Sequence, residues 1–205
     1  MSRTLHVWLY GEHVADAERA SDGTLSLRYG ERGHDVSTSM SSLVERHGHA
    51  HVAPWLAGLL PDNTAVLSRW ATEFQVAPTP FALLGTAIGL DCAGAVQFTP
   101  GGVPLPVRRD SGVEWLDEDQ LARVGEALYR DRTAWGGSRG TGRFSLAGAQ
   151  SKVALRFEDG RYGQPFGDEP TNVIAKPSLP GFEGHDLNEH LCLDAARRCG
   201  VVAPP

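Results

Sequence analysis

The chain has 205 residues, with 19 Lys+Arg against 25 Asp+Glu and a formal net charge of −6 at pH 7. Its 41% hydrophobic and 21% charged residues are typical of a globular protein and exclude a disordered or collagen-like chain. The acidic balance argues against direct nucleic-acid binding, which needs clustered Lys and Arg, and no run of about 18 apolar residues could cross a membrane.

The cysteines and the N-terminus favour a cytoplasmic location. Cys92, Cys192 and Cys199 are odd in number and form no C-x-x-C pair, so neither a disulfide framework nor a thiolate zinc site is indicated. The first residues lack the long apolar stretch of a signal peptide. We therefore expect reduced thiols in a cytoplasmic protein.

The first 30 residues predict antiparallel strands. Apolar side chains alternate with polar or aromatic ones over residues 5–9, and Gly11-Glu12 offers a two-residue turn. A second turn signal, Ser21-Asp22-Gly23, precedes the same alternation over residues 24–29.

Helical spacing replaces this alternation after residue 50. Apolar residues three or four apart predict helices over residues 52–60, 67–74 and 81–88, and Pro61-Asp62-Asn63 ends the first of them. A short apolar strand is expected over residues 93–98.

A change of composition suggests a domain boundary. Residues 99–113 contain three prolines and three glycines, which is typical of a linker or an exposed connection. We therefore expect an N-terminal subdomain at residues 1–100, a linker at 101–113 and a second part at 114–205.

The second part is predicted to open with a helix. Leu121, Val124 and Leu128 form its apolar side, while Asp117 and Gln120 have the spacing of a capping box.

A hairpin, a strand and a helix follow in the second part. A strand over residues 153–157 is joined to the next by a turn at 158–161, and a further strand covers residues 173–176. The last helix is expected from about Asp186 to Cys199, with apolar residues at every fourth position and a glycine directly after it.

Three features in the second part could bind phosphate. Small residues between two strand-like runs allow the backbone to approach a ligand and to present N–H groups to an anion. Lys176 ends an apolar strand, and Glu189 lies thirteen residues later in the first turn of a helix. A loop, a strand lysine and a helix glutamate, in that order, match the phosphate-binding half of a protein-kinase fold. The loop residues are Ala147, Gly148, Ala149, Gln150, Ser151 and Lys152.

Each of these features also has a simpler interpretation. The loop could be an ordinary tight hairpin, and Lys176 could be a solvated lysine at a strand end. Glu189 could form a helix cap with Asp186, because D-x-x-E is close to a capping box and needs no lysine partner.

Other motifs favour structural roles. His47, His49 and His51 could gather a transition metal, but a solvated loop is the better interpretation and we predict no metal site. The glycine-rich run at residues 136–142 lacks the GK[ST] of a P-loop. Trp55 and Trp70 have helical spacing and are expected in a core.

Several stretches of the chain, taken in order, resemble the N-terminal portion of HipA-type serine/threonine kinase toxins. The segment Ala-Gly-Ala-Gln-x-Lys is the most specific of them. The stretches are Leu59-Leu60-Pro61-Asp62-Asn63, Leu83-Leu84, Ile88-Gly89-Leu90-Asp91, Gly94-Ala95-Val96, Ser145-Leu146-Ala147-Gly148-Ala149-Gln150-Ser151-Lys152, Pro170-Thr171-Asn172-Val173-Ile174-Ala175-Lys176, Asn188-Glu189 and Gly200-Val201.

The resemblance implies a set of roles. The loop at residues 147–152 and Lys176 would bind ATP, with Mg²⁺ in the complete kinase, and Glu189 would orient Lys176. Ser145 matches an autophosphorylation site that inactivates the kinase, and a phosphate there adds nearly two negative charges beside the ATP phosphates. The implied partners are a HipB-like helix-turn-helix antitoxin and a protein substrate such as an aminoacyl-tRNA synthetase.

The resemblance also implies that the main catalytic residues of such a kinase lie outside these 205 residues. The catalytic aspartate, the metal-binding asparagine and the second aspartate of such kinases lie in a C-terminal lobe, and no segment here resembles them. We therefore expect an α+β fold, with a small β-meander/helical subdomain followed by an incomplete kinase-like N-lobe that does not transfer phosphate alone. The alternative is a non-catalytic module that engages an antitoxin or a separate kinase subunit.

Overall fold

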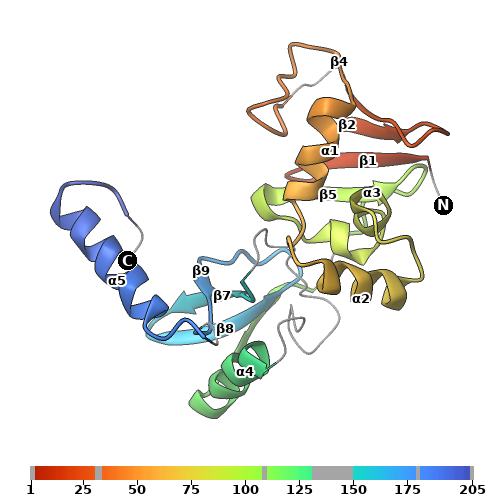
Figure 1. The fold of residues 1–205 in the computed structure, drawn as a ribbon. Helices are drawn as coiled ribbons and strands as arrows, with labels where there is room; N and C mark the ends of the chain where they lie inside the picture. Colours follow the sequence, from red (N-terminus) through yellow and green to blue (C-terminus); the bar gives the residue numbers. More distant parts are fainter. Residues whose placement is uncertain (1–2, 31–33, 108–109, 131–149, 179–180, 204–205) are drawn as a thin grey trace.

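The protein is described by a computed structural model covering residues 3–30, 34–107, 110–130, 150–178 and 181–203. Two antiparallel sheets and their helices occupy different parts of the molecule (Figure 1). This mixture confirms the predicted α+β class. Within these ranges no helix has both the length and the apolar character needed to span a bilayer.

The first sheet has the strand order β4-β3-β2-β1-β5. Its strands are β1 (Thr4–Leu9), β2 (Glu12–Arg19), β3 (Leu25–Tyr29), β4 (Arg46–His47) and β5 (Val96–Pro100). Three helices pack against it, namely α1 (His49–Gly58), α2 (Thr64–Phe74) and α3 (Pro80–Leu84).

The core of this part lies between the sheet and the helices. Leu5 and Val7 are buried, as their alternation predicted. Trp70 is also buried, and the Trp55 ring packs at 5.7 Å from that of Phe98, which confirms both tryptophans as core residues. The side chains on the other face of the sheet are therefore turned away from the helices.

The turn between β1 and β2 lies one residue earlier than predicted. Leu9 pairs with Glu12, so Tyr10 and Gly11 form the loop, with φ angles of 51° and 81°. A two-residue hairpin of this kind requires positive φ at both loop positions. Glycine supplies the second position without strain, and this decides where the turn falls.

The predicted helix at residues 81–88 is broken in two. Helix α3 ends at Leu84, and a 3₁₀ turn over Ala87–Leu90 follows, capped by the Thr86 hydroxyl, which accepts a hydrogen bond from the Ile88 N–H. The predicted strand at 93–98 also starts late. It begins at Val96, because a 3₁₀ turn occupies Ala93–Ala95.

The second sheet has the strand order β6-β8-β7-β9. Its strands are β6 (Gly112–Trp115), β7 (Val153–Glu158), β8 (Arg161–Phe166) and β9 (Val173–Ala175). Helix α4 (Glu118–Arg130) packs on it through Leu128, which meets Val153 and Leu155 in a small second core.

The ends of these elements largely follow the sequence. Asp117 and Gln120 form the predicted capping box, each side chain accepting from the other's backbone N–H at 2.8 and 2.7 Å. The turn between β7 and β8 falls on Asp159 and Gly160, as predicted. The expected linker is shorter than predicted, because Gly112 already pairs in β6.

Helix α5 (His185–Arg198) ends as predicted but begins differently. Gly200 has a φ of 81° directly after the C-cap, Cys199. At the start, Gly184 occupies the N-cap position, and Asp186 lies within the first turn and accepts a hydrogen bond from the Ser178 hydroxyl at 3.0 Å. The predicted Asp186 cap is therefore wrong.

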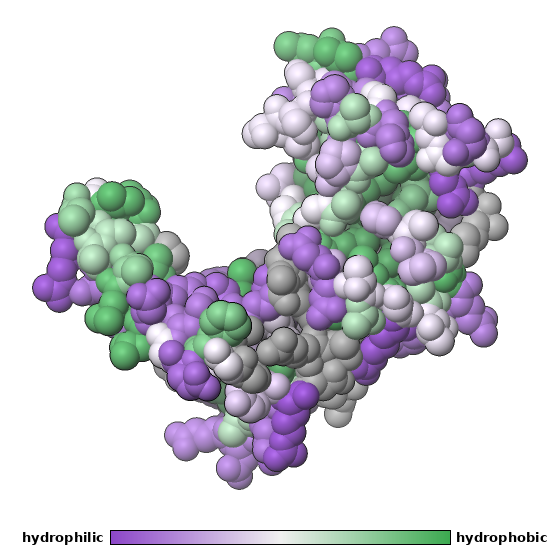
Figure 2. Space-filling model, viewed as in Figure 1, coloured by the Kyte–Doolittle hydropathy of each residue, from purple (hydrophilic) through white to green (hydrophobic). Residues whose placement is uncertain are grey.

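The apolar side of α5 lies in the open. Leu187 and Leu191 are 59% and 57% exposed, and no residue of this helix is buried. Figure 2 shows apolar side chains gathered along α5.

Candidate functional site

The two strands β7 and β9 bring two lysines together. Val153 pairs with Ala175 in the antiparallel ladder, so the next residues outward, Lys152 and Lys176, lie across from each other. They are the only lysines among the 19 Lys+Arg residues of the chain. Like charges directly opposite on neighbouring strands are destabilising unless an anion compensates them.

The pKa of Lys152 reflects the repulsion between the two lysines. Partial burial lowers the pKa of Lys152, and the nearby Lys176 charge lowers it further. The carboxylate of Asp62, from the connection between α1 and α2, acts in the opposite direction. A bound anion would stabilise both ammonium groups, since it would offset the repulsion between them.

Lys176 is held by an ion pair with helix α5. Its Nζ lies 2.7 Å from Oε1 of Glu189, and both side chains are partly exposed. The interpretation of Glu189 as a helix cap is wrong, because this carboxylate faces Lys176. The ion pair joins the end of β9 to the first turns of α5.

The loop before β7 is anchored next to this pair. The side-chain amide of Gln150 donates a hydrogen bond to the carbonyl oxygen of Pro177 at 2.8 Å. Ser151 is buried. The remaining predicted loop residues, Ala147, Gly148 and Ala149, lie outside the described residues, as do Ser145 and the glycine run at 136–142.

The site residues are therefore brought together in part. Gln150, Ser151, Lys152, Lys176 and Glu189 gather at one end of the β7–β9 pair. A pair of amines at neighbouring strand ends is suited to phosphate oxygens, which Lys binds as a point charge. The described residues thus have the charge that an anion such as phosphate requires.

We expect Glu189→Gln to break the ion pair with Lys176 and to remove the contribution of this pair to the pH dependence of the free energy of unfolding. The hydrogen bond from Lys176 and its charge lower the pKa of Glu189 below its ordinary value of 4.5. A lowered pKa means that the ion pair stabilises the fold above pH 4.5 and that this contribution is lost as the pH falls through the lowered value.

The measurement is thermal unfolding of both proteins between pH 7 and pH 3. At neutral pH the variant should lose less than about 1 kcal/mol, because the pair is partly exposed. The difference between the proteins should shrink as the solution becomes acid. Asp194→Asn, which breaks the exposed Arg198 pair on the same helix, is the control. Identical melting of wild type and Glu189→Gln at every pH would contradict the role of the ion pair.

A second cluster of polar side chains lies on the first sheet and was not predicted. His6, His13 and Asp16 place three potential ligand atoms within 4.8 Å of one another, the one such group in the described ranges. The histidines at 47 and 49 make structural hydrogen bonds instead, to the Ser41 carbonyl and from the Leu25 N–H.

Comparison with known proteins finds one family match in the first part of the chain and two similar proteins that extend beyond it. Residues 5–99 match the family described as HipA N-terminal domain. A "Putative kinase Y4mE" of Sinorhizobium fredii is 32% identical over 216 residues, which cover 99% of this chain and 50% of that protein. A "Serine/threonine-protein kinase toxin HipA" of Shewanella oneidensis is 27% identical over 153 residues, 73% of this chain and 33% of that protein. The chain thus spans about half or less of the length of these curated relatives.

Proposed function

We propose that the chain is the nucleotide-binding front part of a HipA-type serine/threonine kinase, because residues 5–99 match the HipA N-terminal domain and because both similar proteins are named as kinases. The observation that carries the proposal is the convergence of Lys152 and Lys176 at one strand end, with Glu189 bonded to Lys176. Residues 1–100 and residues from about 112 to 205, each with its own sheet, would then be separate subdomains.

ATP would supply the phosphoryl group if it were bound at this site. Lys176 would hold the phosphates, oriented by Glu189, and Lys152 would add a second positive charge. The backbone of residues 147–151 would donate N–H groups. Mg²⁺ would be held mainly by a second lobe of the kinase, and we assign it no ligand here. The exposed apolar side of α5 is the surface on which such a lobe would pack.

The proposed partners follow from the family. We propose that a HipB-like helix-turn-helix antitoxin binds the protein through residues 1–100, and that its substrate is a cytoplasmic protein such as an aminoacyl-tRNA synthetase. The protein and this antitoxin would together form a toxin–antitoxin pair. The front part alone would lack catalytic residues, so phosphoryl transfer is expected only from the natural polypeptide that carries a complete kinase fold.

Phosphorylation at Ser145 is the experiment that tests the proposal. The natural polypeptide, purified without its antitoxin and incubated with ATP and Mg²⁺, is expected to gain one phosphate on Ser145 by intact and peptide mass spectrometry. The gain should vanish in Ser145→Ala and remain in Ser21→Ala, an exposed serine in the turn before β3.

The same modification is expected to weaken ATP binding. A phosphate carries nearly two negative charges, which would repel the nucleotide phosphates beside Lys152. Fluorescent-nucleotide titration of the phosphorylated and unphosphorylated forms measures the difference. A polypeptide that neither binds ATP nor incorporates phosphate on any protein would overturn the proposed function.

A further inference from the structure

An irregularity in the first hairpin gathers two histidines on one side of the sheet. His6 pairs with Asp16, but the register shifts between Val7 and Trp8, so that Trp8 faces His13. In a regular strand His13 and Asp16, three residues apart, would point to opposite faces. The bulge inserts one residue, the buried Val14, and thereby turns His13 to the same face as Asp16.

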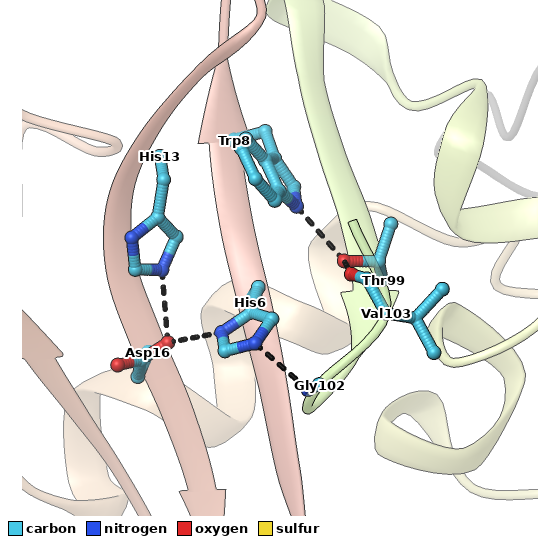
Figure 3. A network of polar contacts seen from close by, with 7 residues as sticks. All are labelled: His6, Trp8, His13, Asp16, Thr99, Gly102 and Val103. Atoms are coloured by element: carbon cyan, nitrogen blue, oxygen red, sulfur yellow. Dashed lines mark hydrogen bonds and ion pairs between the residues drawn. The ribbon is translucent and has the colours of Figure 1, made fainter. Parts of the chain in front are cut away.

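The resulting geometry is compact and reachable from solvent. Nδ1 of His6 lies 2.6 Å from Oδ1 of Asp16, and Nε2 of His13 lies 2.9 Å from the same oxygen. Figure 3 shows both rings directed at this carboxylate, with Trp8 alongside. The three side chains are 23 to 39% exposed.

We propose that His6, His13 and Asp16 form a binding site for a divalent transition-metal ion of the Zn²⁺ type on the outer face of the first sheet. Imidazole nitrogen and carboxylate oxygen are the ligands that such ions take at about 2.0–2.2 Å, with water completing a four-coordinate site. Hard cations such as Mg²⁺ and Ca²⁺ prefer oxygen ligands alone and should not compete. The site lies outside the proposed nucleotide-binding region and is independent of it.

Metal binding is coupled to the turn that follows β5. The backbone N–H of Gly102 donates a hydrogen bond to Nε2 of His6 at 2.9 Å, so the proton of this imidazole is on Nδ1, facing Asp16. A metal on Nδ1 moves the proton to Nε2, which can then no longer accept from Gly102. The bound ion and the Gly102 hydrogen bond therefore exclude each other. Metal binding should break the hydrogen bond that holds the turn after β5 against His6.

The test is calorimetric titration of the full chain with Zn²⁺ and, separately, with Mg²⁺. We expect saturable Zn²⁺ binding with one ion per chain, and an affinity at least tenfold lower in His13→Gln, since even a second-sphere partner of a metal typically contributes that much. His190→Gln, an exposed histidine on α5, and His51→Gln, beside His47, are the matched controls and should bind Zn²⁺ as the wild type does. Circular dichroism checks that each variant is folded.

The amide signal of Gly102 provides the second readout. In ¹H–¹⁵N spectra it is expected to shift on Zn²⁺ addition in the wild type and to stay unchanged in His13→Gln. Equal Zn²⁺ affinity of wild type and His13→Gln, or no saturable binding at all, would overturn the site. Loss of binding in His51→Gln alone would overturn it as well, because the ion would then sit on the 47–51 histidines. Binding that leaves Gly102 unmoved would refute the coupling.

Discussion

Lys176→Met in the natural polypeptide is expected to lower the rate of phosphoryl transfer about 100-fold or more, the typical cost of removing one preorganised charge or donor at a transferring group. The 2.7 Å ion pair with Glu189 holds Lys176 at the proposed phosphate site. Its removal leaves Lys152 as the one lysine in this 205-residue stretch. The measurement is transfer of the γ-phosphate to the protein itself and to a protein substrate, together with nucleotide affinity.

The control for this variant removes an equivalent charge elsewhere. Arg198→Met breaks another 2.7 Å ion pair, with Asp194, on the same helix, and should leave activity unchanged. Lys176→Arg keeps the charge and should retain part of the nucleotide affinity. Full activity of Lys176→Met would show that the two lysines do not form the phosphate site, and the nucleotide-binding proposal would fail.

Phe98→Ala is expected to destabilise the protein by about 3–5 kcal/mol, the usual cost of truncating a fully buried aromatic residue. Phe98 is 1% exposed, pairs with Val7 across β1 and β5, and packs against the Trp55 ring. Removing it would leave a cavity between the first sheet and its helices. Urea unfolding can be followed by tryptophan fluorescence, because two of the five tryptophans, Trp55 and Trp70, belong to this core.

Phe182→Ala is the matched control for this core substitution. Phe182 is 65% exposed, so its truncation removes little buried surface and should change the free energy of unfolding by less than about 0.5 kcal/mol. Equal destabilisation by both substitutions would contradict the central place of Phe98 in the core.

The local elements could be read from the sequence because their signals are local. The Asp117–Gln120 capping box, the Asp159-Gly160 turn and the glycine after α5 each depend on residues a few positions apart. Where two local signals competed for the same helix end, the predicted boundary was wrong. The start of α5 is such a case, since Asp186 had the composition of a cap but Gly184 had the left-handed backbone that the chain reversal there uses.

The sequence by itself determined the α+β class, most of the helices and strands, and a lysine and a glutamate as candidates for one site, but it missed the strands β4 and β6. Only the tertiary structure decided which charges meet. The β7–β9 register sets Lys152 opposite Lys176, and α5 returns Glu189 to the end of β9. The bulge in β2 likewise turns His13 toward Asp16, against the alternation that a regular strand imposes. Spacing along a chain specifies a residue's side of its own element, whereas strand register, bulges and helix docking specify its neighbours across space.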